Sequence, residues 1–139
     1  MPTGADEAFV RAWLGRYEAG WKDGSCAGFW ISGAADGAFL GFAAIVDLDL
    51  GAREGEIGYM VAPAARGRGA SVRAVDLLSR WGFDELGLER LELRIDVTNT
   101  ASERVAERAG YRRDGVLRNI HFQEGLRSDT GVWSRLRTD

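Results

Sequence analysis

Two arginines alternate with two glycines in a short segment that follows an apolar strand pattern and precedes an apolar helix pattern. The first turn of a helix has backbone N–H groups without intrahelical partners, and the helix dipole favours negative charge there. Glycine lets the backbone come close to a ligand, and arginine forms charge-assisted hydrogen bonds with anions. The segment therefore predicts a cradle for a diphosphate group. Its residues are Arg66, Gly67, Arg68, Gly69, Ala70 and Ser71.

Two common phosphate loops do not fit this segment. A P-loop requires a lysine after its last glycine, and the only lysine of the chain is Lys22. A dinucleotide fingerprint requires a third glycine, and Val72 stands at that position. The remaining pattern is Arg/Gln-x-x-Gly-x-Gly/Ala, with Ser71 as a small residue at its last place. The segment resembles the acyl-CoA pyrophosphate loop of the GCN5-related N-acetyltransferases (GNAT).

A second segment strengthens this resemblance. Residues 99–111 resemble the Asn-x-x-Ser-x-x-Val-x-Glu-x-x-Gly-Phe/Tyr segment of the RimJ/RimL-like branch, which acetylates the N-termini of ribosomal proteins. The similarity extends over about residues 25–136. It implies a transferase of the N-acetyltransferase (acyltransferase) type that uses acetyl-CoA as cosubstrate and needs no metal. It also implies that Asn99 contacts the cofactor and that the strand end at Met60 and Val61 pairs with pantetheine.

Acetyl transfer requires a neutral amine, a polarised thioester carbonyl and a neutralised leaving thiolate. The backbone N–H groups of Met60 and Val61 are the candidate donors to the carbonyl oxygen. Glu56, Gly58 and Met60 share one face of the predicted strand, and the glycine leaves room there for a substrate. Glu56 is therefore the first candidate for the general base, acting through a water. A solvated glutamate at a strand end is the alternative.

The leaving thiolate needs a proton donor. Many relatives use a tyrosine at the position that aligns with Ala106 here, and Ser102 is the natural substitute. The branch resemblance also gives this serine the role of general acid. Local capping is the alternative for Ser102, but Thr100-x-x-Glu103 predicts a capping box that already fills the cap position. For Asn99 the alternative is an ordinary turn residue ahead of the helix.

The apolar periodicity predicts a helix, three strands, a helix, a strand, a helix and two strands. This order predicts an α/β (α+β) GNAT fold, with a mixed, mostly antiparallel sheet and flanking helices. The unit at 56–97 should be a right-handed parallel crossover, and the resemblance implies that this parallel pair splays apart. Tyr59 and Tyr111 are expected in the core or at its rim. The predicted ranges are helices 5–21, 69–86 and 100–109, strands 26–31, 38–47, 56–61, 91–97, 111–117 and 131–136, and a polar loop over 118–130.

A chain of 139 residues suits a single domain, here residues 1–139. The family begins with a strand and a helix ahead of the helix that 5–21 resembles. The first strand is therefore expected to be missing, which would leave a sheet edge open to pairing. Exchange of strands in a homodimer is one way to cover such an edge.

The bulk composition excludes several classes of protein. A net charge of −3 argues against non-specific nucleic-acid binding, which needs a basic surface. No apolar run approaches the roughly 18 residues of a membrane span, and no signal pattern is present, so we expect a cytoplasmic protein without membrane contact. The single cysteine, Cys26, excludes an internal disulfide, and the single histidine, His121, cannot form a metal site by itself.

These residues predict direct acetyl transfer from acetyl-CoA to a primary amine. The acceptor is either a protein N-terminus or a small amine such as an amino acid or an antibiotic, because specificity resides in variable loops. The alternative is a non-catalytic module that binds CoA or a nucleotide. The missing first strand and the absence of a tyrosine at position 106 keep that alternative open.

Overall fold

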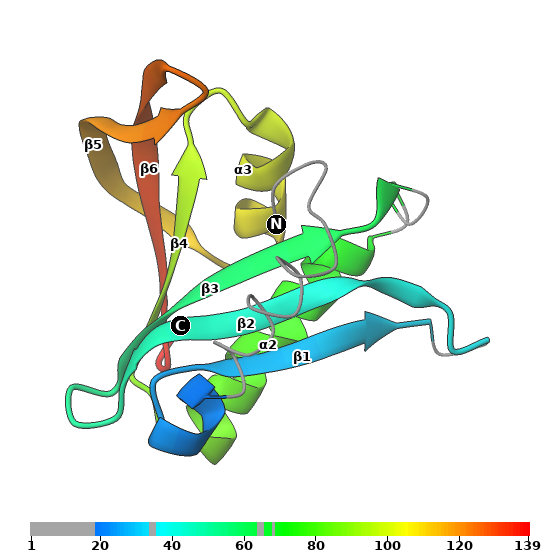
Figure 1. The fold of residues 1–139 in the computed structure, drawn as a ribbon. Helices are drawn as coiled ribbons and strands as arrows, with labels where there is room; N and C mark the ends of the chain where they lie inside the picture. Colours follow the sequence, from blue (N-terminus) through cyan, green and yellow to red (C-terminus); the bar gives the residue numbers. More distant parts are fainter. Residues whose placement is uncertain (1–18, 34–35, 64–65, 68) are drawn as a thin grey trace.

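A six-stranded sheet with two helices packed on it accounts for most of the described residues (Figure 1). The computed structural model describes residues 19–33, 36–63, 66, 67 and 69–139. Residues 19–23 are helical, and the rest of the helix predicted over 5–21 lies outside the described residues. No described helix is long and apolar enough to cross a membrane. In chain order the elements are β1 (Ala27–Ser32), β2 (Phe39–Asp49), β3 (Glu54–Val61), α2 (Ala70–Glu85), β4 (Arg90–Asp96), α3 (Thr100–Arg108), β5 (Arg112–Gln123) and β6 (Leu126–Leu136).

The strand order is β1-β2-β3-β4-β6-β5, and β3 with β4 is the parallel pair. The predicted mixed sheet and the crossover through α2 are therefore confirmed. The pairing of β3 with β4 covers only Glu54↔Arg90 to Glu56↔Glu92. Beyond these positions the two strands diverge, as Figure 1 shows, and within the described part of the chain the rest of β3 has no ladder partner on the side of β4. This divergence opens a wedge toward the C-terminal ends of both strands.

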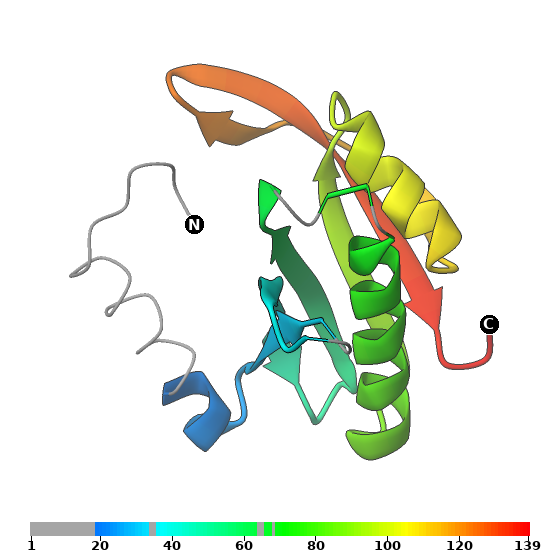
Figure 2. The ribbon, with the colours of Figure 1, turned by 90° about the vertical axis from the view of Figure 1, so that its right-hand side faces the viewer.

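Both helices lie on the same face of the sheet (Figure 2). The alternation predicted for β4 is confirmed, since Leu91, Leu93 and Ile95 are buried while Arg94 is exposed. Burying such side chains contributes roughly 1.5–3 kcal/mol each, so the core fixes which face of each strand meets the helices. The core also includes Ala43, Ile45, Ile57, Val75, Leu78, Phe83, Leu88, Ala106, Ala109, Tyr111 and Trp133.

The predicted polar loop over 118–130 is wrong. β5 and β6 instead form a long hairpin whose turn is Glu124 and Gly125, both with positive φ (53° and 76°). Two adjacent residues of this kind match the right-handed twist of a hairpin. All of β5 except Leu117 is exposed. The outer half alternates Ile120 and Phe122 with polar residues, but both side chains are more than half exposed (52% and 62%), so this short alternation does not mark a buried face.

Arg135 of β6 ties the two helices to the sheet. Its Nη1 donates to Asp76 Oδ1 of α2 and to the Ala109 carbonyl at the end of α3, each at 3.0 Å. The side chain is 16% exposed, so solvent screens these bonds less than at an open surface. The contact fixes the C-terminal end of α3 relative to the middle of α2.

Candidate active site

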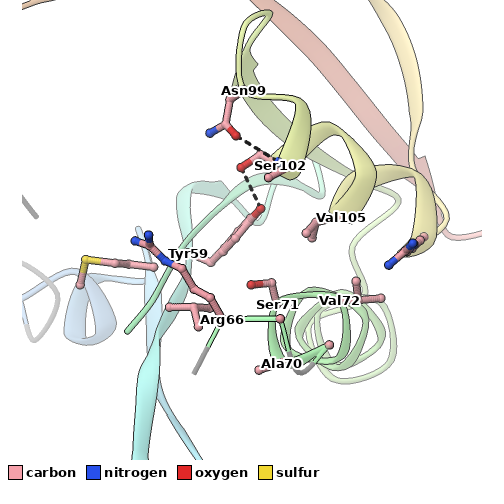
Figure 3. Close-up of a pocket in the computed structure, with 14 residues that line it drawn as sticks. Tyr59, Arg66, Ala70, Ser71, Val72, Asn99, Ser102 and Val105 are labelled. Carbon is pink, nitrogen blue, oxygen red and sulfur yellow. Dashed lines mark hydrogen bonds between the residues drawn. The ribbon is translucent and has the colours of Figure 1, made fainter. Parts of the chain in front are cut away.

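A cavity of about 540 Å³ lies in the wedge between β3 and β4 (Figure 3). Its walls are the end of β3, the loop and first turn at the start of α2, and one face of α3 from the Asn99 cap to Arg108. Every described residue of the predicted cofactor site lines this cavity, and Arg68 lies outside the described residues. Those lining residues are Met60, Val61, Arg66, Gly67, Gly69, Ala70, Ser71, Asn99 and Ser102.

The start of α2 is open to a ligand. Gly69 is its N-cap, with φ 72°, and no side chain among the described residues caps the helix. The first turn contains no acidic residue, and the first helical hydrogen bond runs from the Arg73 N–H to the Gly69 carbonyl at 3.1 Å. The N–H groups of residues 70–72 therefore have no intrahelical partner and border the cavity. This arrangement suits an anion.

Gly67 and Gly69 are required for their backbone angles. Both have positive φ (80° and 72°), a conformation that side-chain-bearing residues rarely adopt. A Cβ at either position would have nothing within 4 Å. The glycines therefore shape the bend that turns the chain from β3 into α2, and they leave open space beside it.

The edge of β3 gives the wedge hydrogen-bonding groups. The Ala62 N–H donates to the Leu40 carbonyl at 2.7 Å, toward β2. Successive N–H groups of a strand point to opposite sides, so the Met60 N–H also points to β2, whereas those of Tyr59 and Val61 point to the side of β4. Of the two predicted carbonyl-oxygen donors, Val61 is thus the one directed into the wedge.

Asn99, and not Thr100, caps α3. Asn99 is the N-cap and its Oδ1 accepts from the Ser102 N–H at 3.1 Å, so the predicted Thr100-x-x-Glu103 capping box is wrong. The reason is a shift of one residue, because asparagine competes with threonine for the cap and is preferred there. Glu103 instead lies 3.9 Å from Arg113 Nη1.

Tyr59 is a site residue that the sequence interpretation missed. Its hydroxyl donates to Ser102 Oγ at 3.2 Å, and both side chains line the cavity (Figure 3). Burial raises the pKa of the Tyr59 phenol, while the hydrogen bond to Ser102 opposes the rise. No sequence pattern links two residues that lie 43 positions apart in the chain.

Glu56 does not line this cavity. It lies two positions before Gly58 on the face of β3 opposite Ile57, a residue of the core under the helices. A Cβ at Gly58 would have nothing within 4 Å, so this face is open beside Glu56, as predicted from the glycine. Burial raises the pKa of Glu56, Asp47 and Glu92 add to the rise, and Arg94 opposes it.

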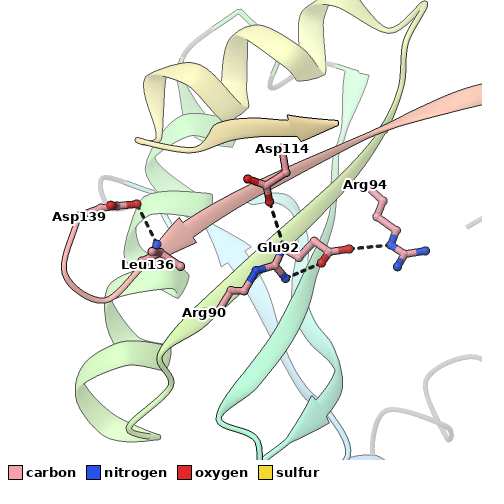
Figure 4. Close-up of polar contacts among 6 residues, drawn as sticks. All are labelled: Arg90, Glu92, Arg94, Asp114, Leu136 and Asp139. Atoms are coloured by element: carbon pink, nitrogen blue, oxygen red, sulfur yellow. Dashed lines mark hydrogen bonds and ion pairs between the residues drawn. The ribbon is translucent and has the colours of Figure 1, made fainter. Parts of the chain in front are cut away.

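A charged network supports the closed end of the wedge (Figure 4). Arg90 Nη1 donates to Glu92 Oε2 at 2.6 Å, and Arg94 Nε donates to Glu92 Oε1 at 2.8 Å. Arg90 Nη2 also reaches Asp114 Oδ2 of β5 at 3.0 Å. Glu56 is opposite Glu92 in the strand register, and Arg94 acts electrostatically on both carboxylates at the point where β3 and β4 meet.

His121 is exposed on β5, where its Nε2 lies 3.2 Å from Gln123 Oε1. It does not line the cavity. Within the part of the chain that the structure describes, no group of three or more His, Cys, Asp or Glu side chains is arranged to hold a metal ion.

Comparison with known proteins identifies the family. Residues 1–112 match the family described as "Acetyltransferase (GNAT) domain". The chain belongs to the GNAT acetyltransferase family. Members of this family use acetyl-CoA as cosubstrate, and the cavity of this GNAT chain has the open helix start and the free strand edge that such a ligand needs.

Two relatives come from Bacillus subtilis (strain 168). The "Uncharacterized N-acetyltransferase YoaA" is 34% identical over 82 residues, 59% of this chain and 46% of YoaA. The "Putative ribosomal N-acetyltransferase YdaF" is 32% identical over 104 residues, 75% of this chain and 57% of YdaF. The GNAT chain therefore spans about half the length of these curated relatives.

The fold resembles solved acetyltransferases. A mutant form of the spermidine N-acetyltransferase SpeG from Vibrio cholerae superposes with a TM-score of 0.83 at 20% identity, over 92% of this chain and 75% of that one. At this identity the likeness shows the fold alone. It agrees with the mixed sheet, the splayed parallel pair and the flanking helices described above.

Proposed function

We propose that this chain catalyses direct transfer of an acetyl group from acetyl-CoA to a primary amine. The observation that carries the proposal is the cavity in the wedge, where the uncapped start of α2 and the free edge of β3 face the same space. The first-turn N–H groups of α2 and the Arg66 guanidinium would hold the diphosphate. Asn99 would contact the cofactor from the start of α3, and pantetheine would lie along the edge of β3.

The remaining roles follow from position and chemistry. The Val61 N–H would donate to the thioester oxygen as it gains negative charge, an interaction often worth about 2.7–4 kcal/mol. Glu56 would take the proton of the amine through a water on the open face beside Gly58. Its raised pKa makes it a better base than an ordinary surface glutamate. Ser102 would give a proton to the departing thiolate.

The sequence does not define which class of amine accepts the acetyl group. The name of YdaF refers to ribosomal acetylation and that of SpeG to spermidine. We therefore propose two acceptor classes for the test, a protein N-terminus and a small amine such as a polyamine. Asp47 acts electrostatically on Glu56 at this face, and carboxylates that no cation fully offsets attract a protonated amine.

Two measurements test the proposal on the full chain. Calorimetry with CoA and acetyl-CoA should give one binding site for each. Thiol release from acetyl-CoA should then depend on an added amine, tested with spermidine, a peptide with a free N-terminal alanine and an aminoglycoside. A reaction without protein and one without amine control for hydrolysis and for the thiol of Cys26. Binding with no amine-dependent release would favour a non-catalytic module, and an absence of CoA binding would refute the whole proposal.

A further inference from the structure

The hydroxyl groups of Tyr59 and Ser102 meet at the wall of the cavity. Tyr59 comes from the end of β3 and Ser102 from the first turn of α3, and the phenol donates to the serine oxygen at 3.2 Å. Figure 3 shows the Tyr59 ring pointing from the strand toward Ser102. Because the tyrosine proton lies on this bond, the serine proton must point elsewhere. Ser102 lines the cavity, so its own hydroxyl is set to donate to a group bound there.

A serine on its own is a poor proton donor to a thiolate. A thiol has a pKa of about 8.5 and a tyrosine phenol of about 10, whereas an aliphatic alcohol is a far weaker acid than either. A serine that lost its proton to the thiolate would become an alkoxide, at a large cost in free energy. A phenol is only slightly weaker than the thiol as an acid, so a phenol behind the serine removes most of this cost.

We propose, building on the proposed function, that Tyr59 is a positioning residue that supplies the proton of the leaving thiolate through Ser102. As the tetrahedral intermediate collapses, the C–S bond breaks and its electron pair goes to sulfur. The Ser102 proton passes to sulfur, and the serine oxygen takes the Tyr59 proton, which leaves a phenolate. The proton lost by the amine goes through water to Glu56, and the phenolate regains a proton from solvent before the next turnover.

The state of Tyr59 agrees with this role. Burial raises the pKa of its phenol, so the proton is present at neutral pH, and the hydrogen bond to Ser102 opposes the rise that would make the phenol a weaker acid. The Tyr59 side chain and its hydrogen bond to Ser102 also connect β3 to α3 across the wedge. They therefore fix Ser102 relative to the strand edge on which the thioester would lie.

The chain contains a matched control for this pair. Tyr111 and Ser79 also join their hydroxyl groups, at 2.7 Å, but neither lines the cavity in the wedge. Both residues are buried. Tyr111→Phe thus removes the same atom from the same type of pair without touching the candidate site.

The test measures kcat and KM for Tyr59→Phe, Ser102→Ala, the double variant and Tyr111→Phe, with the amine that the wild-type chain acetylates. We expect Tyr59→Phe and Ser102→Ala each to lower kcat at least tenfold, with KM for acetyl-CoA within about threefold of wild type. The double variant should be no slower than Ser102→Ala, since both changes break one relay. Tyr111→Phe should retain kcat. Full kcat in Tyr59→Phe, or losses that multiply in the double variant, would overturn the inference.

A second readout does not depend on activity. The ultraviolet titration of Tyr59, taken as the difference between wild type and Tyr59→Phe, should move to higher pH in the Ser102→Ala background, because the Ser102 hydroxyl can donate to the ionised phenol and so lowers its pKa. An unchanged titration would show that the pair is not formed and would also overturn the inference. If the wild-type chain transfers no acetyl group, the proposed function fails, while this titration still decides whether the pair exists.

Discussion

The Asn99 side chain accepts a hydrogen bond from the Ser102 backbone N–H at 3.1 Å, so the predicted cofactor contact caps the turn that carries the predicted acid. The cap holds Ser102 at a fixed place in the first turn of α3, next to Tyr59. Asn99 has a second polar group, its amide NH₂, and the side chain lines the cavity. One residue can therefore both cap the helix and contact a ligand.

Substitutions of Asn99 separate these two functions. Asn99→Ala removes the cap and should lower the free energy of unfolding by about 1 kcal/mol. Asn99→Ser keeps a capping oxygen but lacks the amide, so its stability should stay near that of wild type. If the amide contacts the cofactor, Asn99→Ser should weaken CoA binding by about threefold to tenfold. Thermal melts and calorimetry check both values, and unchanged CoA binding in Asn99→Ser would show that Asn99 is only a cap.

A carboxylate at the start of α2 should repel the diphosphate. Ser71→Glu places negative charge beside the first-turn N–H groups, and we expect the dissociation constant of CoA to rise at least tenfold. The same charge near a helix N-terminus stabilises the folded chain by about 0.3–1 kcal/mol, so weaker binding should accompany an equal or higher melting temperature. Leu77→Glu adds the same charge to the same helix at a position that is 65% exposed, and it should bind CoA like wild type. Equal effects of the two changes would contradict the predicted cradle.

The sequence predicts best where one face of an element is buried. Leu91, Leu93 and Ile95 alternate with polar residues, and the burial of that face allows only one register. The bend at Gly67 and Gly69 is likewise local, since it requires backbone angles that glycine adopts readily. These features placed the strand and the bend, whereas the wedge between β3 and β4 was expected only from the family resemblance.

Contacts between residues far apart in the chain, and strands that are exposed on both faces, could not be predicted in the same way. The outer half of β5 is exposed on both faces, and its only apolar alternation, Ile120 and Phe122, is too short to distinguish the hairpin that turns at Gly125 from a loop. The bond between Tyr59 and Ser102 depends on how far β3 and β4 diverge, which is a property of the whole sheet. The cap of α3 was misplaced by one residue because Asn99 and Thr100 both have side chains that can cap.

Glu56→Gln should remove the base while keeping the shape of the strand. We expect kcat to fall about a hundredfold, within the usual range for a general base. The pKa of Glu56 is raised above the ordinary value of 4.5. The wild-type rate should therefore increase with pH as Glu56 loses its proton, around a pH above 4.5. In the variant this acidic limb, the fall of the rate at low pH, should be absent. Glu54→Gln, an exposed position on the same face of β3, should keep both the rate and the limb.

The stability of Glu56→Gln should change in the opposite direction to its activity. A carboxyl whose pKa is raised by folding binds protons more tightly in the folded state, so its contribution to stability is present at low pH and lost as pH rises through the raised value. Replacing it by a neutral amide should therefore raise the melting temperature at pH 7 relative to wild type, with a smaller gain at low pH. A variant that is less stable at pH 7 would indicate that the Glu56 carboxylate has a structural role.

The pair of Tyr111 and Ser79 should govern stability in alkaline solution. Ser79 Oγ donates to the Val75 carbonyl at 2.6 Å, so Tyr111 is the donor in the bond between the two hydroxyls. Burial raises the pKa of Tyr111 to about 12. A raised phenol pKa means that its stabilisation is complete below pH 10, the ordinary value, and is lost as pH rises toward 12.

Tyr111→Phe should lower the free energy of unfolding by about 1 kcal/mol at pH 7, since one net hydrogen bond is lost and Ser79 keeps its bond to Val75. The difference from wild type should shrink as pH rises above 10, because the wild-type phenol then ionises in the unfolded chain. Ser79→Ala should cost more, about 1–3 kcal/mol, because it leaves the buried Tyr111 hydroxyl without its acceptor. Urea unfolding at several pH values measures these differences. A constant gap between Tyr111→Phe and wild type up to pH 12 would show that burial does not hold this phenol in its neutral form.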